Sequence, residues 1–451
     1  MLEPLYTAAE MREAEERYPG YPDSAGELME RAGAAVALEA MRAFPRARSF
    51  GVVCGGGANG GDGRIAARVL SEAGRVAEET DEPERYDVVI DALFGTGFRG
   101  APREEAASMI ERINACDAPV VAVDLPSGVN ASTGEVEGAA VEAALTVTFH
   151  GRKVGVAVAP GRFHAGRVVV AEIGLEAAET RAHRATEAIL RSVPRRAPHD
   201  SKYTAGTVLV VGGSPGMTGA AVLTATAALR ADAGYVTLAV PRESLTVVEG
   251  LTLEPVKRGF AWETAADEIL AEAQRARALA LGPGLGRGQE ARGLVAELLR
   301  RVELPTVVDA DALHELQPVR RAAPTVLTPH AGELARLLDT DAGWVNEHRL
   351  EAAERCAEAY GAVVLLKGAD TIVQAPGEGP IVCDQAPPSL ATAGSGDVLT
   401  GVIAAFLAKG LGAAEAAAAA AVAHGIAAAS VPEQPGLVAS DVVTALPRAL
   451  S

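Results

Sequence analysis

The chain alternates short apolar runs with amphipathic segments, and the runs end in glycine-rich or acidic turns. The runs of the first half are 50–54, 86–90 and 119–123, and those of the second half are 207–211, 235–240, 278–281, 306–308, 325–327 and 362–366. Amphipathic stretches such as 64–73 and 103–115 lie between them. Because β-rich runs that alternate with helical patterns are joined by crossovers, the sequence predicts parallel sheets covered by helices.

The alternation occurs twice. With 451 residues the chain is longer than one ordinary domain. Residues 176–199 interrupt the pattern with a charged segment that we expect to be helical and to break at Pro194 and Pro198. The sequence therefore predicts two tandem three-layer α/β/α domains, covering residues 1–185 and 186–451.

Charge and cysteine content narrow the possible functions. A formal charge of −18 argues against a broad nucleic-acid-binding surface, although single lysines or arginines can still bind phosphates. The four cysteines lie far apart in the sequence, and none of them forms a CxxC pair. We therefore expect neither a disulfide framework nor a structural zinc site.

Two apolar features bear on the expected compartment. The first 20 residues are acidic and lack an apolar core, so we do not expect them to be a signal peptide. Residues 416–421 are all alanine, but Glu415 and His424 flank this run and glycine interrupts the wider segment at Gly412 and Gly425. A buried alanine-rich helix is therefore expected rather than a membrane span, in a cytoplasmic protein.

The segment 391–397, which precedes the helix expected over 398–407, is a candidate catalytic loop. Gly394 and Gly396 allow a tight turn that places N–H groups against an anion at the start of a helix. Asp397 would lie in the first turn of that helix. A carboxylate beside an anion hole can take the proton of a hydroxyl during phosphoryl transfer. A simple helix cap would produce a similar pattern.

Three other turns of the second half also follow strands. His330 lies where a ligand contact is possible, although a lone histidine is usually structural. Lys367 could hold a nucleotide phosphate, and the alternative is a solvated hairpin turn. The glycines of 282–286 permit close backbone approach to a ligand.

In their order, these motifs resemble the ribokinase-like superfamily and, more narrowly, the ADP- or ATP-dependent NAD(P)H-hydrate dehydratases. The matching segments are 202–206, 212–214, 218–221, 281–286, 309–313, 328–333, 367–371 and 391–397. They cover essentially the whole second half.

The resemblance implies that nucleoside phosphate energy drives the removal of water from a hydrated nicotinamide ring. The ring hydroxyl would be phosphorylated, with Asp397 as the base, and elimination of the phosphate would restore the double bond. ADP is implied as the phosphate donor, together with Mg²⁺. The nucleotide-binding residues would be Lys367, Gly368, Ala369, Asp370, Thr371, Gly394, Ser395 and Gly396, and the substrate-binding residues would be Ala221, Gly286, His330 and Asp397.

In the first half, residues 55–63 contain six glycines in nine positions directly after a strand. The segment lacks a Walker lysine and does not fit the dinucleotide fingerprint cleanly. It is typical of a flexible, anion-accepting turn with two polar side chains, Asn59 and Asp62; a plain tight turn is the alternative.

Together with 91–97 and 124–128, this segment resembles the NAD(P)H-hydrate epimerases, whose domain is Rossmann-like. Segments 149–155, 160–162 and 168–174 fit the same family, so the match covers about residues 1–175. The resemblance implies that Asp124 is the acid/base at the nicotinamide end and that Lys153 assists in binding or charge balance. The other substrate-binding residues would be Ala58, Asn59, Gly60, Gly61, Asp62, Gly95, Thr96, Gly97, Phe98, Arg99, Gly100 and Ala101.

The same resemblance implies a potassium ion held by Asn59, Asp91 and Ser127. Oxygen-only ligands suit a hard cation and disfavour zinc. The sequence departs from the two families at Ala58, where an asparagine is common, and at Asp232, where glycine is usual. We expect the second departure to change a helix cap rather than the chemistry.

The two halves together predict repair of hydrated nicotinamide cofactors. The N-terminal domain would interconvert R- and S-NAD(P)H hydrate, and the C-terminal domain would dehydrate the S form. The expected partners are these small molecules and ADP, with neither nucleic acid nor membrane, in a homo-oligomer. The alternative is a ribokinase-like vitamin-precursor kinase fused to a non-catalytic Rossmann-like binding module.

Overall fold

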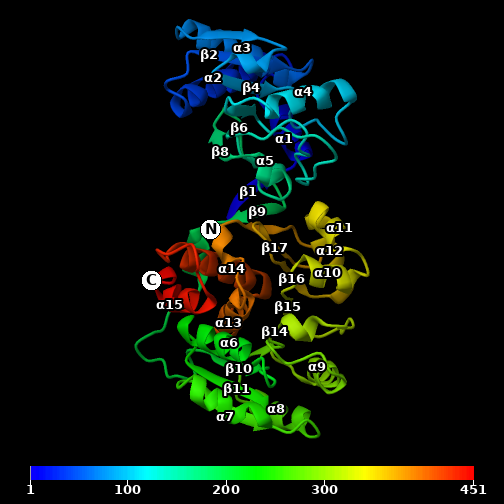
Figure 1. Ribbon diagram of the computed structural model, residues 1–451, viewed down its shortest axis with the longest axis vertical. Coiled ribbons are helices and arrows are strands. Elements are labelled where there is room, and N and C mark those ends of the chain that lie inside the picture. The colour runs from blue at the N-terminus through cyan, green and yellow to red at the C-terminus, as the bar shows by residue number, and fades with distance from the viewer. Residues whose placement is uncertain (1) are drawn as a thin grey trace. The chain divides into compact units, whose positions relative to one another are not determined.

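The protein, as a computed structural model that describes residues 2–451, forms two compact units (Figure 1). One is built mainly from Pro4–His183, and the other mainly from Arg184–Val345 and Arg349–Ser451. Each unit contains a largely parallel sheet with helices packed on it, so the predicted α/β class is confirmed. The functional limits 1–185 and 186–451 remain a prediction.

The sheet of the N-terminal unit has the strand order β3-β2-β4-β5-β6-β8, and all its neighbours are parallel. Its strands are β2 (Ser49–Cys54), β3 (Val76–Glu79), β4 (Val88–Ala92), β5 (Val120–Val123), β6 (Leu145–Phe149) and β8 (Arg167–Ala171). The chain passes from β2 to one side for β3 and to the other side for β4. In such sheets a ligand crevice lies at this switch point, outside the carboxyl ends of the strands.

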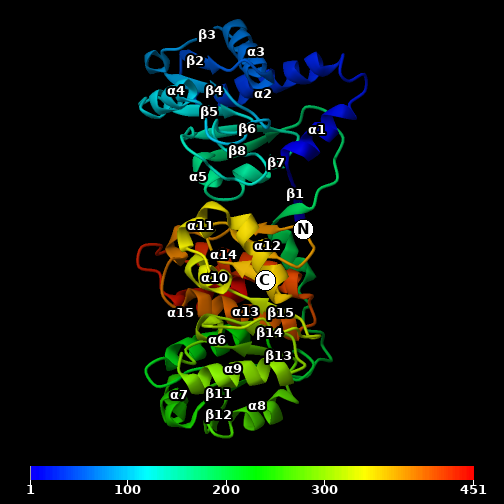
Figure 2. The same ribbon diagram turned by 90° about the vertical axis from the view of Figure 1, so that its right-hand side faces the viewer.

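Helices cover both faces of this sheet. They are α1 (Ala8–Glu16), α2 (Ala25–Ala43), α3 (Ala58–Glu72), α4 (Glu104–Asn114) and the short α5 (Gly161–His164), and a small strand pair is formed by β1 (Leu2–Tyr6) and β7 (Arg152–Lys153). Figure 2 shows α2 and α3 together beside the sheet. Val52 packs in the core that these two helices cover, whereas its neighbour Val53 packs with Ile110 of α4. Successive strand residues thus point into different layers.

The sheet of the C-terminal unit contains β12-β11-β10-β13-β14-β15-β16-β17-β18 in that order, parallel up to β16 and antiparallel beyond it. The strands are β10 (Thr207–Val211), β11 (Tyr235–Pro241), β12 (Val256–Phe260), β13 (Ala278–Leu281), β14 (Thr306–Val308), β15 (Thr325–Leu327), β16 (Val363–Leu366), β17 (Thr371–Gln374) and β18 (Ile381–Cys383). The strands expected from the sequence are therefore present.

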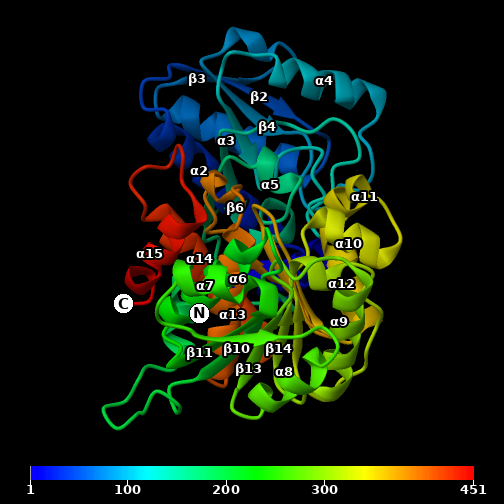
Figure 3. The ribbon, with the colours of Figure 1, turned by 60° about the horizontal axis from the view of Figure 1, so that its bottom comes forward.

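Helices lie on both sides of this second sheet (Figure 3). One side carries α6 (Thr218–Arg230), α13 (Ser395–Ala408), α14 (Ala413–Ala429) and α15 (Ala439–Ala449), and the other carries α9 (Gln289–Arg301), α10 (Ala331–Leu338) and α12 (Arg349–Tyr360). The remaining helices are α7 (Leu245–Leu251), α8 (Ala265–Ala273) and α11 (Ala342–Glu347). The predicted three-layer arrangement is confirmed.

The alanine run 416–421 lies in α14 and is buried, as expected. Small residues let the helices approach closely. A side chain at Gly401 of α13 would place its Cβ 2.2 Å from the Thr224 carbonyl oxygen of α6. No helix among residues 2–451 is both long and apolar enough to cross a membrane.

The expectation of a helical segment at 176–199 is wrong. The chain forms a strand, β9 (Ala182–Ala185), and a short 3₁₀ helix at Glu187–Ser192. Long-range contacts decide this conformation: Arg184 Nε donates to Asp384 Oδ2 at 2.8 Å, and Ile189 and Leu190 are buried in the core of the C-terminal unit. Local helix propensity is a weak preference that such contacts override.

The backbone conformation and ion pairs of Asp232 account for an aspartate at a position where glycine is usual in the family. Its φ of 72° lies in the left-handed region, where glycine is favoured and aspartate is among the better-tolerated residues. Its carboxylate also lies 2.6 Å from Arg196 Nε and 2.7 Å from Lys409 Nζ. The aspartate therefore caps the end of α6 and neutralises the Lys409 side chain, which is 5% exposed.

Candidate active sites

The predicted catalytic loop of the C-terminal unit lies at the start of α13. Gly394 has a φ of 86°, and α13 begins at the next residue, Ser395. The first N–H groups of a helix have no partner within the helix and can face an anion. The Asp397 carbonyl accepts a hydrogen bond from Thr224 Oγ1 at 3.0 Å, which anchors this first turn on α6.

Lys367 reaches this loop from the end of β16. A Cβ at Gly396 would lie 3.3 Å from Lys367 Nζ, so glycine leaves room for the ammonium group. Lys367 Nζ donates to Asp309 Oδ1 at 3.0 Å, and Thr400 Oγ1 donates to Asp309 Oδ2 at 2.7 Å. Asp309 follows β14 and is 2% exposed. The structure therefore brings Lys367 and the predicted phosphate loop together.

The buried charges control the ionisation of Lys367 and Asp397. Burial alone lowers the pKa of Lys367, but the Asp309 and Glu333 carboxylates outweigh it and hold this pKa above its usual value. Burial, and next the negative charge of Asp309, raise the pKa of Asp397 to about 7. A carboxyl that titrates near neutral pH suits a general base.

His330 has both a structural and a possible ligand-binding role. Its Nδ1 accepts hydrogen bonds from the N–H groups of Gly332 at 3.0 Å and Glu333 at 3.3 Å, and so caps α10. The Glu333 carboxylate accepts from His330 N at 2.9 Å, which completes the capping box. Because Nδ1 is an acceptor, the neutral ring carries its proton on Nε2. The side chain is 56% exposed, so this edge can meet a ligand.

The turn 367–370 connects the antiparallel strands β16 and β17, so the hairpin expected as the alternative is its local structure. The buried Arg349 side chain fixes this turn. Arg349 Nε of α12 lies 3.0 Å from the carboxylate of Asp370, which is 1% exposed, and Arg349 Nη2 donates to the Lys367 carbonyl at 3.4 Å. A Cβ at Gly368 would lie 2.4 Å from Arg349 Nη2. Asp370 thus shapes the turn through Arg349.

The other predicted contacts of this unit lie at neighbouring strand ends. Ala221 is fully buried beneath Gly213, where a Cβ would lie 3.0 Å from the alanine methyl. Gly286 has a φ of 90°, and its N–H donates to Asp311 Oδ2 at 2.9 Å. Ala221 therefore packs beneath the loop after β10, and Gly286 supplies a backbone conformation of the loop after β13; the substrate contacts predicted for both residues remain a prediction.

In the N-terminal unit the glycine-rich segment differs from the expected flexible turn. The helix α3 already begins at Ala58. Packing requires two of the glycines. A Cβ added at Gly60 would lie 1.9 Å from the Gly55 carbonyl oxygen, and a Cβ added at Gly63 would lie 2.5 Å from the Ala92 methyl group. The predicted substrate residues 58–62 therefore lie on the first turns of a helix.

Asp124 ends β5 with a φ of 66° and forms a buried ion pair. Its Oδ1 accepts from Lys153 Nζ at 2.5 Å, Thr148 Oγ1 at 3.0 Å and Phe149 N at 3.2 Å. Lys153 is 0% exposed and also donates to Thr148 Oγ1 and the Phe149 carbonyl. The second carboxylate oxygen of Asp124 takes part in none of these bonds, so it can accept from a substrate.

Asp124 lines a hollow of about 560 Å³ at the carboxyl end of the sheet. Asn59, Asp62 and residues 95–99 of the predicted substrate loop line it as well. Burial, then the charges of Asp124 and Glu15, raise the pKa of Asp62 to about 8. The hollow therefore combines a carboxylic acid that stays protonated at neutral pH with an ion-paired carboxylate.

Glu15 of α1 also lines this hollow, and sequence reasoning missed it. Burial and the charge of Asp124 raise its pKa. No local motif marks the residue; only the burial of its helix neighbours Met11 and Ala14 shows that this helix faces the protein.

The predicted cation ligands lie beside this hollow. Asp91 is 0% exposed; its Oδ1 accepts from Ser127 Oγ at 2.6 Å and its Oδ2 from Ser127 N at 2.8 Å. Burial raises the pKa of Asp91 to about 6. Asn59 is close to the same loop, because its Oδ1 lies 3.0 Å from where a Gly95 Cβ would be; its Nδ2 is buried and has no hydrogen-bond partner among residues 2–451.

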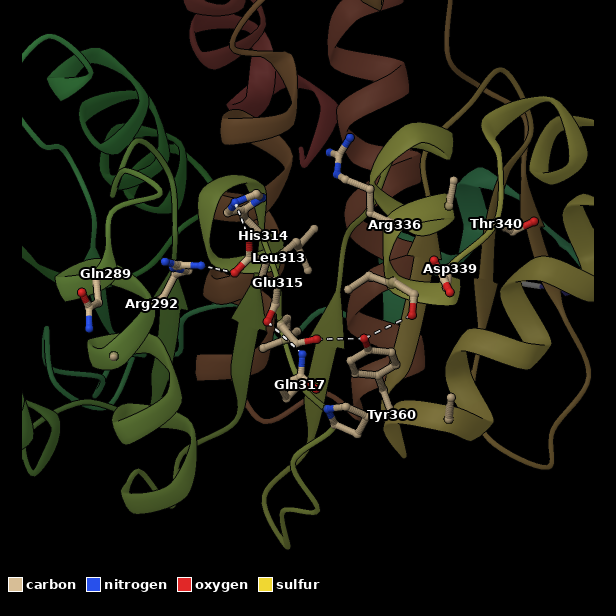
Figure 4. A pocket seen from close by; sticks show the side chains of 16 residues that line it. Gln289, Arg292, Leu313, His314, Glu315, Gln317, Arg336, Asp339, Thr340 and Tyr360 are labelled. Carbon is tan, nitrogen blue, oxygen red and sulfur yellow. Dashed lines mark hydrogen bonds and ion pairs between the residues drawn. The ribbon is translucent and has the colours of Figure 1, made fainter.

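A hollow of about 1110 Å³ in the C-terminal unit contains none of the predicted site residues. It lies between α9 and α10, where the connection from β14 to β15 has only a short 3₁₀ helix at Ala310–Leu313. Figure 4 shows Arg292 paired with Glu315 there, and Tyr360, whose hydroxyl donates to the Leu316 carbonyl at 2.9 Å. Pocket size alone therefore does not identify the catalytic site.

Comparisons with known proteins match both units. Residues 208–448 match the family model described as NAD(P)H-hydrate dehydratase, and residues 25–78 and 72–155 match the YjeF-related protein N-terminus. The chain is 38% identical to the bifunctional NAD(P)H-hydrate repair enzyme Nnr of Moorella thermoacetica, over 99% of this chain and 96% of that protein. It is 35% identical to the Escherichia coli enzyme of the same name, over 94% and 89%.

Among solved structures, the chain is similar to the ADP/ATP-dependent NAD(P)H-hydrate dehydratase from Bacillus subtilis, co-crystallised with ATP/Mg²⁺. The identity is 29% and the TM-score 0.55, over 58% of this chain and 96% of that chain. The fold is also similar to that of a ribokinase-like superfamily protein from Enterococcus faecalis, with a TM-score of 0.54 and 22% identity over 61% of this chain and 97% of that chain. The C-terminal unit therefore has the ribokinase-like fold.

The Lys153–Asp124 pair gives a stability prediction. Lys153→Met leaves the Asp124 carboxylate buried without its counter-charge, so the free energy of unfolding should fall by about 3–5 kcal/mol. The double variant Asp124→Asn/Lys153→Met removes both charges and should recover part of this loss. Urea unfolding followed by circular dichroism measures both. Equal losses in the single and double variants would contradict the argument.

Proposed function

The chain belongs to the family of bifunctional NAD(P)H-hydrate repair enzymes, and we propose that residues 186–451 carry the dehydratase and residues 1–185 the epimerase. Epimerisation and nucleotide-dependent dehydration of the hydrated cofactor are its two activities. The observation that carries the dehydratase assignment is the buried network in which Lys367 and Asp309 adjoin the Gly394–Asp397 loop.

In the dehydratase, the N–H groups at the start of α13 and Lys367 bind the phosphate that is transferred. Asp397 takes the proton of the ring hydroxyl as the hydroxyl oxygen attacks this phosphate, whose bond to the rest of the nucleotide breaks, so that AMP leaves when ADP is the donor. The carbon–oxygen bond then breaks, phosphate leaves, and a proton is lost from the adjacent ring carbon to restore the double bond. The hydrate contacts the His330 edge and the Gly286 loop.

Mg²⁺ and a nucleotide are supported by the ATP/Mg²⁺ complex of the Bacillus subtilis relative, and we propose ADP as the donor here. Among residues 2–451 no group of three or more His, Cys, Asp or Glu side chains could hold a metal ion. This fits Mg²⁺, which is commonly bound through substrate phosphates and water with few protein ligands. When bound, the ion neutralises charge on the phosphates.

In the epimerase, the chemistry is assigned to the carboxyl groups of the 560 Å³ hollow. Protonated Asp62 donates to the ring hydroxyl, which leaves as water while the ring nitrogen supplies the electron pair. Water returns to the opposite face and gives a proton to the free oxygen of Asp124. Asp124 then releases this proton to solvent and Asp62 takes one up, which restores both groups. Lys153 fixes the position of that carboxylate through its three hydrogen bonds.

Asn59, Asp91 and Ser127 would hold K⁺ beside this hollow. The fit rests on their chemistry: the Asn59 amide, the Asp91 carboxylate and the Ser127 hydroxyl each offer a hard oxygen donor. The ion would supply positive charge beside the bound cofactor.

The alternative of a vitamin-precursor kinase fused to a non-catalytic module is not favoured. Repair enzymes match nearly the whole chain, and Asp62, Asp124 and Lys153 form a complete acid/base site. We also propose that the protein is a cytoplasmic homo-oligomer whose partners are small molecules, in keeping with its charge of −18. Light scattering on the purified chain tests the oligomeric state.

Asp397→Ala tests the dehydratase assignment. Without its base the variant should lose at least about 1000-fold in kcat, while binding of the hydrate stays within a few-fold. Recovery of the reduced-nicotinamide absorbance band from purified hydrate measures the rate, with ADP and ATP compared. Asp267→Ala, at a side chain 78% exposed, is the matched control. Full activity of Asp397→Ala would refute its role.

The fall of kcat/KM for dehydration at acid pH (the acid limb) should follow the protonation of Asp397. Its pKa is raised to about 7, so the carboxylate form is lost as the pH falls through 7, and kcat/KM should fall with it. Asp309→Asn removes the negative charge and should move this limb to lower pH, by about one unit. Thr400→Val removes a hydrogen bond but keeps the charge of Asp309, so its limb should stay in place. An unmoved limb in Asp309→Asn would contradict the electrostatic argument.

Asp124→Asn separates the two activities. It keeps the shape of the side chain but lacks a basic oxygen, so exchange between the epimers should slow by about 100-fold or more. Chromatographic separation of R- and S-hydrate follows the exchange without nucleotide. Dehydration of S-hydrate should remain at the wild-type rate. Unchanged epimer exchange would exclude Asp124 as the acid/base.

Potassium can be tested without turnover. Adding K⁺ should raise the melting temperature of the N-terminal unit, because an ion that binds only the folded state stabilises it. Li⁺ at equal ionic strength is the control. Asp91→Asn should abolish the K⁺-specific shift, and equal shifts with both ions would argue against the site.

A further inference from the structure

A second hollow, of about 640 Å³, lies in the N-terminal unit next to the one that contains Asp124. It opens at the carboxyl ends of β2 and β4, between Cys54 and Leu93, and extends along α4 to Met109. The two hollows share Leu93, Phe94, Phe98 and Arg99. They therefore meet at a common wall, at the switch point of the sheet.

The shared wall is aromatic. The rings of Phe94 and Phe98 stack with centroids 4.7 Å apart and an interplanar angle of 19°. Beyond it, the second hollow has an apolar lining that includes Val53, Ala106 and Met109. Flat rings and small apolar groups of this kind suit a planar heterocycle such as a nucleobase.

Charged groups surround this apolar lining. Arg99 and Arg103 line the hollow together with Glu105; both arginines are exposed and neither forms an ion pair with Glu105 or with any other residue within 2–451. Two unneutralised guanidinium groups favour phosphate, which they can bind through paired hydrogen bonds.

Asp81 adds a carboxylate that could bond a sugar hydroxyl. Asp81 lines the hollow and follows β3, the strand that comes after the glycine-rich segment and α3. In doubly wound sheets that bind dinucleotides, an acidic residue at the end of this second strand bonds the adenosine ribose.

We propose that the second hollow binds the adenosine half of the dinucleotide substrate, while the hollow with Asp124 holds the hydrated nicotinamide half. This inference rests on the proposed epimerase function. Arg99, which lines both hollows, binds the phosphate on the nicotinamide side, and Arg103 binds the phosphate on the adenosine side. Phe98 and Met109 flank the adenine, and Asp81 bonds the ribose. The pyrophosphate crosses from one hollow to the other beside Arg99.

The test compares a substrate that contains adenosine with one that lacks it. Epimer exchange is measured without nucleotide on NADH hydrate and on the hydrate of reduced nicotinamide mononucleotide, which lacks adenosine. Arg103→Ala and Ala106→Trp are the variants, since these residues line only the second hollow. Arg42→Ala, an exposed residue of α2 paired with Glu39, is the control.

We expect KM for NADH hydrate to rise about 10-fold in each variant, the loss expected for one charged hydrogen bond or a blocked subsite. KM for the mononucleotide hydrate should change less than about 2-fold. An unchanged KM for NADH hydrate, or an equal rise for both substrates, would overturn the proposal.

A binding measurement keeps the inference separate from the epimerase assignment. Calorimetric titration of NADH hydrate should resolve two sites in the wild-type chain and weaken only one of them in Arg103→Ala. If the wild-type chain binds at two sites but exchanges no epimers, the epimerase assignment fails and the adenosine subsite stands. If Arg103→Ala leaves both sites unchanged, the subsite fails regardless of exchange.

Discussion

Each unit pairs a lysine with a buried aspartate at the carboxyl ends of its strands, and the geometry of each site depends on that pair. Lys153 and Asp124 are almost without exposure in the N-terminal unit, and Lys367 is bonded to the buried Asp309 in the C-terminal unit. A charge removed from water is tolerated only when it is paired and hydrogen-bonded. The pairs therefore fix the positions of the charged side chains that face each site.

Ionisation follows from the same burial. In the N-terminal unit Asp62 has a pKa of about 8 beside the ion-paired Asp124, and in the C-terminal unit Asp397 has a pKa of about 7 beside the lysine-bound Asp309. Two carboxyl groups in unlike surroundings can serve as acid and base at one pH. The two units reach this arrangement with different folds and different strand ends.

Sequence patterns predicted what depends on neighbours along the chain. The strand and helix alternation, the turn carrying Lys367 and the helix start at Gly394–Asp397 all follow local rules. Asp309, Arg349 and Glu15 were not assigned roles, because each acts on a site residue far away in the sequence. Segment 176–199 was assigned wrongly for the same reason, since Arg184 and the buried Ile189 determine its conformation through distant partners.

Most glycines of the glycine-rich segments are required for packing and do not take part in the chemistry. Gly60, Gly63 and Gly368 are required because a neighbouring backbone or guanidinium group occupies the space of a side chain, whereas Gly396 leaves room for the Lys367 ammonium. Only the last of these serves the reacting groups directly. A glycine motif therefore marks a place where chain segments are pressed together at strand ends, and the chemistry belongs to the charged side chains that this close packing admits.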